Sequence, residues 1–303
     1  MEVILGIEVV IALGFFLRRR GVLDGTAGAA ISRLCADVLV PAMILNSMLM
    51  ELTPEILRQC GWLILGSVIM LLLAYLFGHL FIRVARPARE DGVIYRYCIL
   101  FSNFGLVGLP IAEGLYGSEG VFYFTIAILA YRILFNSYGI MMMRGNRDGK
   151  GLSWRSFVNM PILALVLGIV LDLLHIGLWG PIKEFVSLLA KANAPMGLLA
   201  VGINLGDRKI TDGVRNARLW ATIAIRLLIM PMLALITLRF FPVNALLVEM
   251  LVLAFALPCP AMASVLAKRY DRNAALGSQL VLLSTLLSAL TIPLVLYICH
   301  LVL

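Results

Sequence analysis

The chain alternates between long apolar stretches and short polar connections. A helix needs about 20 mostly apolar residues to cross a bilayer, so the pattern predicts ten membrane-spanning helices. Their expected ranges are 3–17, 29–50, 60–83, 93–116, 119–142, 157–175, 182–205, 216–239, 243–267 and 273–300. The first is short, at roughly 22 Å of helix, so we expect snorkelling arginines or local thinning of the bilayer to cover the difference.

Composition places the chain in the lipid bilayer. Hydrophobic residues make up 62% of its 303 residues, charged residues 14%, and the mean hydropathy is +1.00. A soluble domain of this size could not bury so much apolar surface. We therefore expect an all-α integral membrane protein.

Basic residues cluster in alternate connections between the predicted helices. These clusters lie at 18–20, 83–91, 144–155, 207–218 and 268–272. Lysine and arginine accumulate on the cytoplasmic side, so we expect a multi-pass protein of the cell membrane with both termini outside the cytoplasm. The net charge of +8 then reflects topology, and no nucleic-acid partner is expected. A signal peptide carries its positive charge before the apolar region, so the first helix is expected to be retained.

The fourth predicted helix contains residues that disfavour a helix at mid-depth. The stretch NFGLVGLP (103–110) holds an asparagine, two glycines and a proline. When the sequence is shifted by 154 residues, this stretch falls on LPCPAMAS (257–264), which carries Pro258 and Pro260. The sequence thus predicts a broken helix at matching places in the two halves of the chain.

Other residues coincide at the same shift, Pro41 with Pro195 among them. Five spans in each repeat is an odd number, so the second repeat would enter the membrane in the opposite sense. We expect a five-plus-five inverted repeat, with residues 1–143 as the first repeat, 144–156 as a short cytoplasmic loop and 157–303 as the second repeat.

Broken helices in matching halves of an inverted repeat indicate a transporter binding site. Lipid cannot satisfy the backbone groups that a break frees, so the breaks must line a cavity within the protein. Gly105, Gly108 and Pro110 are expected to set the first break, and Pro110 and Pro260 suit the first turn of a restarted helix. Two helix N-termini near the midplane would favour an anion. The alternative is that the prolines are kinks that serve packing alone.

Several stretches resemble the auxin efflux carrier family, whose bacterial members include malonate and malate permeases. They are LGFFLRRRGVLD (13–24), ISRLCADVLVPAMIL (31–45), NFGLVGLPIAEGLYG (103–117), NAPMGLLAVGINL (193–205) and residues 257–297. The resemblance implies ten spans, crossed fourth and ninth helices, and a fold shared with bile-acid symporters and NhaA-type antiporters. It also implies a moving core and a scaffold interleaved in one membrane domain, with a homodimer through the scaffold helices as an expectation.

The resemblance also implies roles for particular residues. In plant auxin carriers, the asparagine at the position of Asn103 contacts the substrate carboxylate, and Asn159 matches another asparagine of the family. This chain has Glu113 where those carriers have a lysine, and Arg226 where they have a lysine on the eighth helix. The third predicted helix lacks their acidic residue, so neither auxin nor their proton site can be carried over.

Two arginines lie near the middle of predicted helices, Arg132 in the fifth and Arg226 in the eighth. Charged side chains at this depth usually mark a transport pathway or pair with each other. Each arginine could bind a carboxylate, replace a coupling cation, or form an ion pair with one of the acids. The acids considered are Glu8, Asp37, Glu113 and Glu249. We expect Arg226 to serve function and Arg132 to belong to a buried pair.

Two further polar residues complete the candidates. Asp37 can pair with Arg33 along one helix face, and Asn193 precedes Pro195 in the seventh predicted helix. Five isolated cysteines and three scattered histidines predict no metal site and no cofactor.

The leading functional hypothesis is a secondary transporter for a small mono- or dicarboxylate, working by alternating access. A cation/proton antiporter and a membrane sensor without transport are the alternatives. No Walker motif or nucleophile–base pair occurs, so we expect neither ATP-driven transport nor enzymatic activity. The coupling ion, a proton or sodium, is left open.

Overall fold

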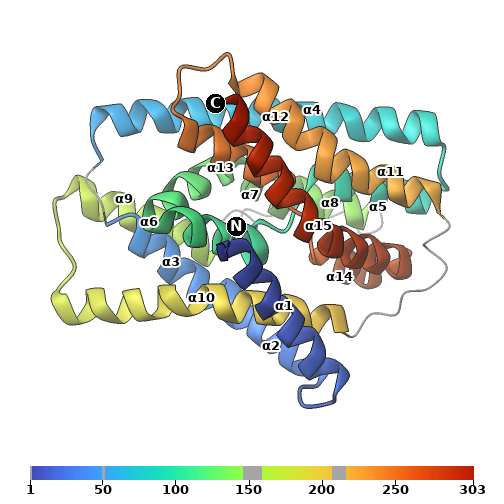
Figure 1. Ribbon diagram of the computed structural model, residues 1–303, viewed down its shortest axis with the longest axis horizontal. Helices are drawn as coiled ribbons and strands as arrows, with labels where there is room; N and C mark the ends of the chain where they lie inside the picture. The colour runs from blue at the N-terminus through green and yellow to red at the C-terminus, as the bar shows by residue number, and fades with distance from the viewer. Residues whose placement is uncertain (1, 50–51, 146–158, 207–215) are drawn as a thin grey trace. The chain divides into compact units, whose positions relative to one another are not determined.

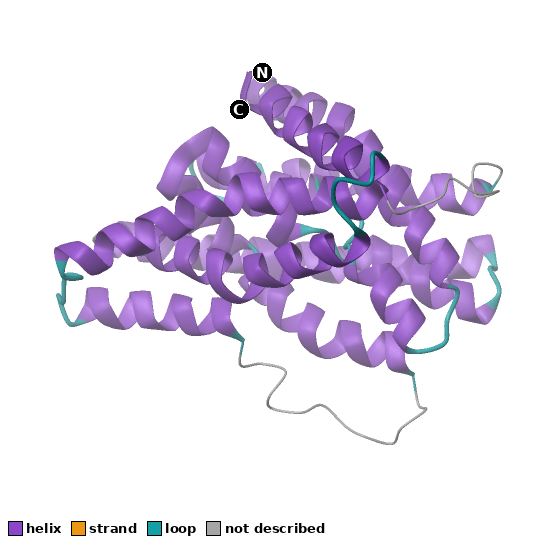
Figure 2. Cartoon of the chain, turned by 90° about the horizontal axis from the view of Figure 1, so that it is seen from below, coloured by secondary structure: helices purple, strands orange, loops and turns teal. Residues whose placement is uncertain are grey.

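A computed structural model describes residues 2–49, 52–145, 159–206 and 216–303, which are mostly helical and contain no strand (Figure 2). Figure 1 shows the order of the helices along the chain. They are α1 (Glu2–Arg19), α2 (Gly25–Leu34), α3 (Val40–Ser47), α4 (Pro54–Ala85), α5 (Arg89–Leu100), α6 (Leu109–Ala127), α7 (Leu129–Leu134), α8 (Ile140–Arg144), α9 (Met160–Leu173), α10 (Gly180–Gly206), α11 (Ala217–Ala224), α12 (Met230–Leu238), α13 (Ala245–Ala256), α14 (Met262–Arg269) and α15 (Ala274–Val302).

Wider π-helical turns interrupt some of these helices. They are η1 (Cys35–Leu39), η2 (Phe104–Gly108), η3 (Phe135–Gly139) and η6 (Ile225–Ile229). After η1, η2 and η6, the second residue of the next helix is a proline: Pro41, Pro110 and Pro231 respectively. A proline lacks the N–H for an α-helical bond and clashes with the carbonyl one turn earlier. A π turn before each proline lets the chain continue as a helix.

Within the described residues, six helical segments are long and apolar enough to cross a membrane by length and composition. They are Gly25–Ser47, Pro54–Ala85, Arg89–Ala127, Gly180–Gly206, Ala217–Leu238 and Ala274–Val302. Met160–Leu173 and Ala245–Ala256 are shorter apolar helices. Helical residues occur in each of the ten predicted segments, and the prediction of an all-helical membrane protein is confirmed.

The chain forms two compact units, each assembled from separate parts of the sequence. The first contains Met1–Gly61, Gly105–Ile126 and Val158–Asp207, and the second contains Trp62–Phe104, Ala127–Phe157 and Arg208–Leu303.

In the first unit, α1 packs along α10 (Figure 1). Two glycines allow this close approach. A Cβ atom on Gly14 would collide with the carbonyl oxygen of Leu199, and one on Gly202 would collide with that of Ile11. The helices α2 and α3 pack on α10 as well, and α9 packs on α3.

In the second unit, α13 lies at the centre. Every residue of α13 from Leu247 to Ala256 is buried, and the helix packs against α12 and α15. A helix that is apolar on all sides can be stable only when surrounded by other apolar groups. The helix that follows the break, α14, packs along α15.

The first break lies earlier than we predicted. The helix α5 ends at Leu100, residues 101–103 are non-helical, and η2 then leads into α6. Gly105 and Gly108 belong to the π turn, and Pro110 follows it within α6. A Cβ atom on Gly105 would meet no atom within 4 Å. The non-helical part of the break is thus residues 101–103, and the stretch with Gly105 and Gly108 continues it as a π turn.

The second break lies where the sequence predicted it, but Pro260 has a different place relative to the next helix. The helix α13 ends at Ala256, and α14 begins at Met262. Pro260 precedes α14 instead of occupying its first turn, and its carbonyl oxygen accepts a hydrogen bond from Ala263 N at 2.9 Å.

Candidate functional site

The two breaks contact each other within the second unit. Asn103 N donates to the carbonyl oxygen of Pro258 at 3.0 Å, and the Ser102 hydroxyl donates to that of Ala254 at 3.1 Å. Cys259 N donates to the Ser284 hydroxyl at 3.0 Å. Side chains and main chain of the protein therefore satisfy backbone groups that lipid could not satisfy.

Arg226 lies in η6 and is completely buried. Its Nε donates to the Leu257 carbonyl at 3.0 Å, its Nη2 to the Ala254 carbonyl at 2.9 Å, and its Nη1 to the Ile99 carbonyl at 3.4 Å. The guanidinium also lies 5.6 Å from the ring centroid of Phe255. Each nitrogen of Arg226 thus has a backbone partner next to a break.

Arg132 lies in α7, and only 6% of its surface is exposed. Its guanidinium lies 5.2 Å from the ring centroid of Phe104, the residue that follows Asn103. Its Nη2 is buried and has no hydrogen-bond partner. A cation–π contact replaces only part of the lost hydration of a buried charge, so Arg132 remains an incompletely compensated cation beside the first break.

Aromatic rings surround this charge. Phe104 packs edge to face against Tyr131 and Phe135, with centroids 5.8 and 5.4 Å apart. Tyr97 extends the cluster through Phe135 at 5.9 Å, and its buried hydroxyl has no hydrogen-bond partner. The first break is therefore flanked by an apolar wall that carries three unpartnered donors among the described residues: Arg132 Nη2 and the hydroxyls of Tyr97 and Tyr131.

Comparison with known proteins identifies the family. The sequence pattern of a family described as membrane transport protein matches residues 1–152 and 149–296. The chain belongs to the auxin efflux carrier family of membrane transport proteins. The resemblance seen in the sequence is confirmed, and this auxin efflux carrier family member is a multi-pass membrane transporter.

Similar proteins occur in archaea and bacteria. An uncharacterized transporter of Methanothermobacter thermautotrophicus is 26% identical over 97% of this chain and 96% of its own length. The uncharacterized transporter MJ1031 of Methanocaldococcus jannaschii is 23% identical over 97% of both chains. The uncharacterized transporter YfdV of Escherichia coli K12 is 23% identical over 99% of this chain and 97% of its own.

The acids considered as partners of the arginines are divided between the two units of this auxin efflux carrier family member. Glu249 of the second unit lies with its Oε1 3.7 Å from His300 Nδ1. Glu8, Asp37 and Glu113 belong to the first unit. Asp37 is exposed within η1, and the Oε2 atom of Glu113 is buried without a hydrogen-bond partner.

The two candidate asparagines, Asn159 and Asn193, lie in the first unit. Asn159 caps α9, and its Oδ1 accepts a hydrogen bond from Ile162 N at 3.1 Å. Asn193 is buried in α10 with its Nδ2 3.5 Å from Met43 Sδ, and its Oδ1 has no hydrogen-bond partner. Asn159 thus stabilises a helix end with its Oδ1 atom but has a buried Nδ2 donor without a partner, and Asn193 has a buried acceptor without one.

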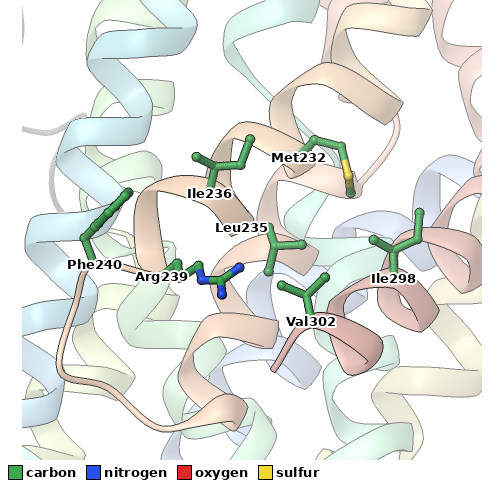
Figure 3. A pocket seen from close by; sticks show the side chains of 7 residues that line it. All are labelled: Met232, Leu235, Ile236, Arg239, Phe240, Ile298 and Val302. Carbon is green, nitrogen blue, oxygen red and sulfur yellow. The ribbon is translucent and has the colours of Figure 1, made fainter.

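Hollows occur in the second unit away from the breaks. One of about 370 Å³ is lined by apolar residues of α12 and α15, with Arg239 and Phe240 beside them (Figure 3). Another of about 770 Å³ lies at the start of α5 and includes Arg89, Glu90, Arg96, Arg144 and Arg272 in its lining. Arg272 pairs with Glu90 at 2.7 Å. The second hollow is strongly basic, and it brings Arg96 together with arginines from three of the basic clusters seen in the sequence.

Sequence reasoning missed Ser102 and Ser284, whose hydroxyls bind the main chain at the breaks. Both are hydroxyl residues within apolar stretches. Such residues commonly form hydrogen bonds between helices in membranes, and this signal could have identified them.

Proposed function

We propose that this protein is a secondary active transporter that moves a small organic anion, a mono- or dicarboxylate, across the cytoplasmic membrane. One observation carries the proposal: the buried Arg132 guanidinium beside the first break, with its Nη2 atom unpartnered. A buried charge is strongly destabilising unless an opposite charge compensates it. A carboxylate accepts two parallel hydrogen bonds from a guanidinium and so meets this requirement.

In this proposal, the substrate carboxylate lies between Arg132 and the side chain of Asn103. The two residues are linked through Phe104, which follows Asn103 and contacts Arg132. Gly105, Gly108 and Pro110 continue the first break, and Pro258 and Pro260 belong to the second. Asn193 and Asn159 are separate candidates for substrate binding within the first unit, and Glu113 and Asp37 are candidates for coupling to a proton or sodium.

The proposed architecture has ten spans in two inverted repeats, residues 1–143 and 157–303, joined by the loop at 144–156, with the fourth and ninth spans crossing. Support comes from α5 and α13, which are both 12-residue helices that end at a break. The first unit gathers α1, α2, α3, most of α6, α9 and α10, and each unit takes parts from both halves of the chain. We propose the first unit as the scaffold and the second as the core of an alternating-access cycle.

The proposed orientation places both termini outside the cytoplasm. The basic hollow at the start of α5 then faces the cytoplasm, where its positive charge would attract anionic substrates. A homodimer would form through helices of the first unit.

The substrate class can be tested by ligand-dependent thermal stability. The purified protein is heated with a panel of mono- and dicarboxylates, auxins and amino acids, because a ligand that binds only the folded state raises its melting temperature. We expect stabilisation by a small carboxylate, and we expect Arg132→Gln to weaken this binding at least about tenfold. Arg58→Gln, at an exposed arginine that pairs with Glu55, is the matched control. Equal stabilisation of wild type and Arg132→Gln would contradict the proposed site.

A further inference from the structure

Three backbone carbonyl groups converge on the Arg226 guanidinium. Ile99 lies in the last turn of α5 and Ala254 in the last turn of α13, and Leu257 follows α13 directly. Their oxygen atoms accept hydrogen bonds from Nη1 at 3.4 Å, Nη2 at 2.9 Å and Nε at 3.0 Å. One side chain on η6 thereby connects the ends of two helices that are far apart in sequence.

Electrostatics explains why a cation belongs at this position. The last carbonyl groups of a helix have no partner within the helix, and each helix C-terminus carries roughly half a negative charge. Two such ends next to each other amount to about one negative charge. The single positive charge of Arg226 balances them in a place where the side chain is completely buried.

We propose that Arg226 is a positioning residue, a tethered cation that binds the C-terminal ends of α5 and α13 together and aligns the two breaks. It occupies the place in which a free monovalent cation would otherwise be needed among these carbonyls. Alignment of the breaks therefore requires no sodium. The proposal concerns the second unit alone and does not depend on which anion is transported.

This role differs from that of a carboxylate ligand. Nε, Nη1 and Nη2 each bind main-chain oxygen, and the ring of Phe255 lies beside the guanidinium. Ala254 O also accepts the Ser102 hydroxyl, and Asn103 N binds Pro258 O. Arg226 is thus part of a network that joins residues 99–103 to residues 254–258.

Chemical rescue tests the proposal in the purified full-length protein. Arg226→Ala removes a group that ethylguanidinium replaces atom for atom. We expect this variant to lose several degrees of melting temperature, and we expect Cys259, which is buried in the wild type, to react with a thiol reagent at least about tenfold faster. Mass spectrometry of the Cys259 peptide gives the reaction rate without replacing the other cysteines.

Millimolar ethylguanidinium chloride is expected to restore both properties in a saturable manner, whereas choline chloride at the same concentration is not. The matched control is Arg218→Ala, because Arg218 also donates its Nε to a backbone carbonyl, that of Ala85 at 2.9 Å, but at an exposed site. Absence of rescue in Arg226→Ala, or equal rescue in Arg218→Ala, overturns the proposal.

Two further variants decide the matter if Arg226→Ala does not fold. Arg226→Lys keeps the charge and Arg226→Met keeps much of the volume, so we expect the lysine variant to melt at the higher temperature. A methionine variant as stable as the lysine variant overturns the proposal. So does a wild-type protein in which protection of Cys259 requires sodium in place of choline.

Discussion

At the scale of single residues, the two buried arginines differ in what surrounds them. Arg226 has carbonyl partners at the ends of two helices, whereas Arg132 has the face of Phe104 and an unpartnered Nη2 atom. Their sequence contexts are alike, since each lies in an apolar stretch at similar depth. The difference in partners suggests opposite roles, with Arg226 positioning the breaks and Arg132 binding the substrate.

The first residue-scale prediction concerns Arg132. Replacing it with methionine removes a charge that the second unit compensates incompletely. We expect the ligand-free variant to be as stable as the wild type or more stable, because replacing a poorly compensated buried charge by an apolar group is often neutral or stabilising. Thermal unfolding without ligand measures this. A large loss of stability would instead support the expectation from the sequence that Arg132 belongs to a buried ion pair.

The second concerns Asn103. Its backbone N–H, not its side chain, binds Pro258 O, so Asn103→Ala should preserve the fold. Loss of a charge-assisted hydrogen bond to a carboxylate should weaken binding by about 1–3 kcal/mol. Calorimetric titration with the carboxylate found in the ligand panel measures the affinity. Unchanged affinity in folded protein would remove Asn103 from the site.

At the scale of helices, prolines and glycines act through the shape of the backbone. Pro41, Pro110 and Pro231 each follow a π turn, so these three prolines mark a widened turn rather than an end, whereas Pro195 and Pro293 lie inside continuous α-helices. The real interruption at residues 101–103 carries no proline or glycine. The Ser102 hydroxyl finds its partner on α13, and Asn103 N finds its partner at Pro258 in the second break.

Gly202 provides the element-scale prediction. A methyl group at this position would collide with the backbone of α1, so we expect Gly202→Ala to destabilise the protein by about 1–3 kcal/mol through overpacking. Gly6→Ala is the matched control on α1, because a Cβ atom there meets nothing within 4 Å. The melting temperatures of the two variants give the comparison. Equal values would show that α1 can move away from α10 at little cost.

At the scale of the whole molecule, each unit is assembled from distant parts of the chain. The first unit takes α1, α2, α3 and most of α6 from one half and α9 and α10 from the other. Because each unit combines helices from both halves of the chain, a single membrane topology sets the orientation of the helices in both units. The proposed topology rests on the alternation of basic connections.

Cysteine labelling in intact cells tests this topology. Gly149 and Arg208 lie outside the described residues, in connections expected to be cytoplasmic, and Gly180 begins α10 on the opposite side. Single cysteines at positions 149 and 208 should react only with a membrane-permeant reagent. A cysteine at position 180 should also react with an impermeant one. External labelling at position 149 would reverse the orientation.

The sequence by itself determined the class of the protein, because apolar content and stretch length depend only on composition and order. It located helical residues in all ten expected segments. It also predicted that the breaks containing Asn103 and Pro258 belong to the same site, and these two residues do contact each other. The placement of the break and the partners of each charge were decided by tertiary structure. A proline or glycine is visible locally, but a carbonyl at the end of α5 becomes a partner of Arg226 only when α13 and η6 are packed beside it. Hydrogen bonds between residues 127 positions apart depend on that packing, and hydropathy contains no information about it.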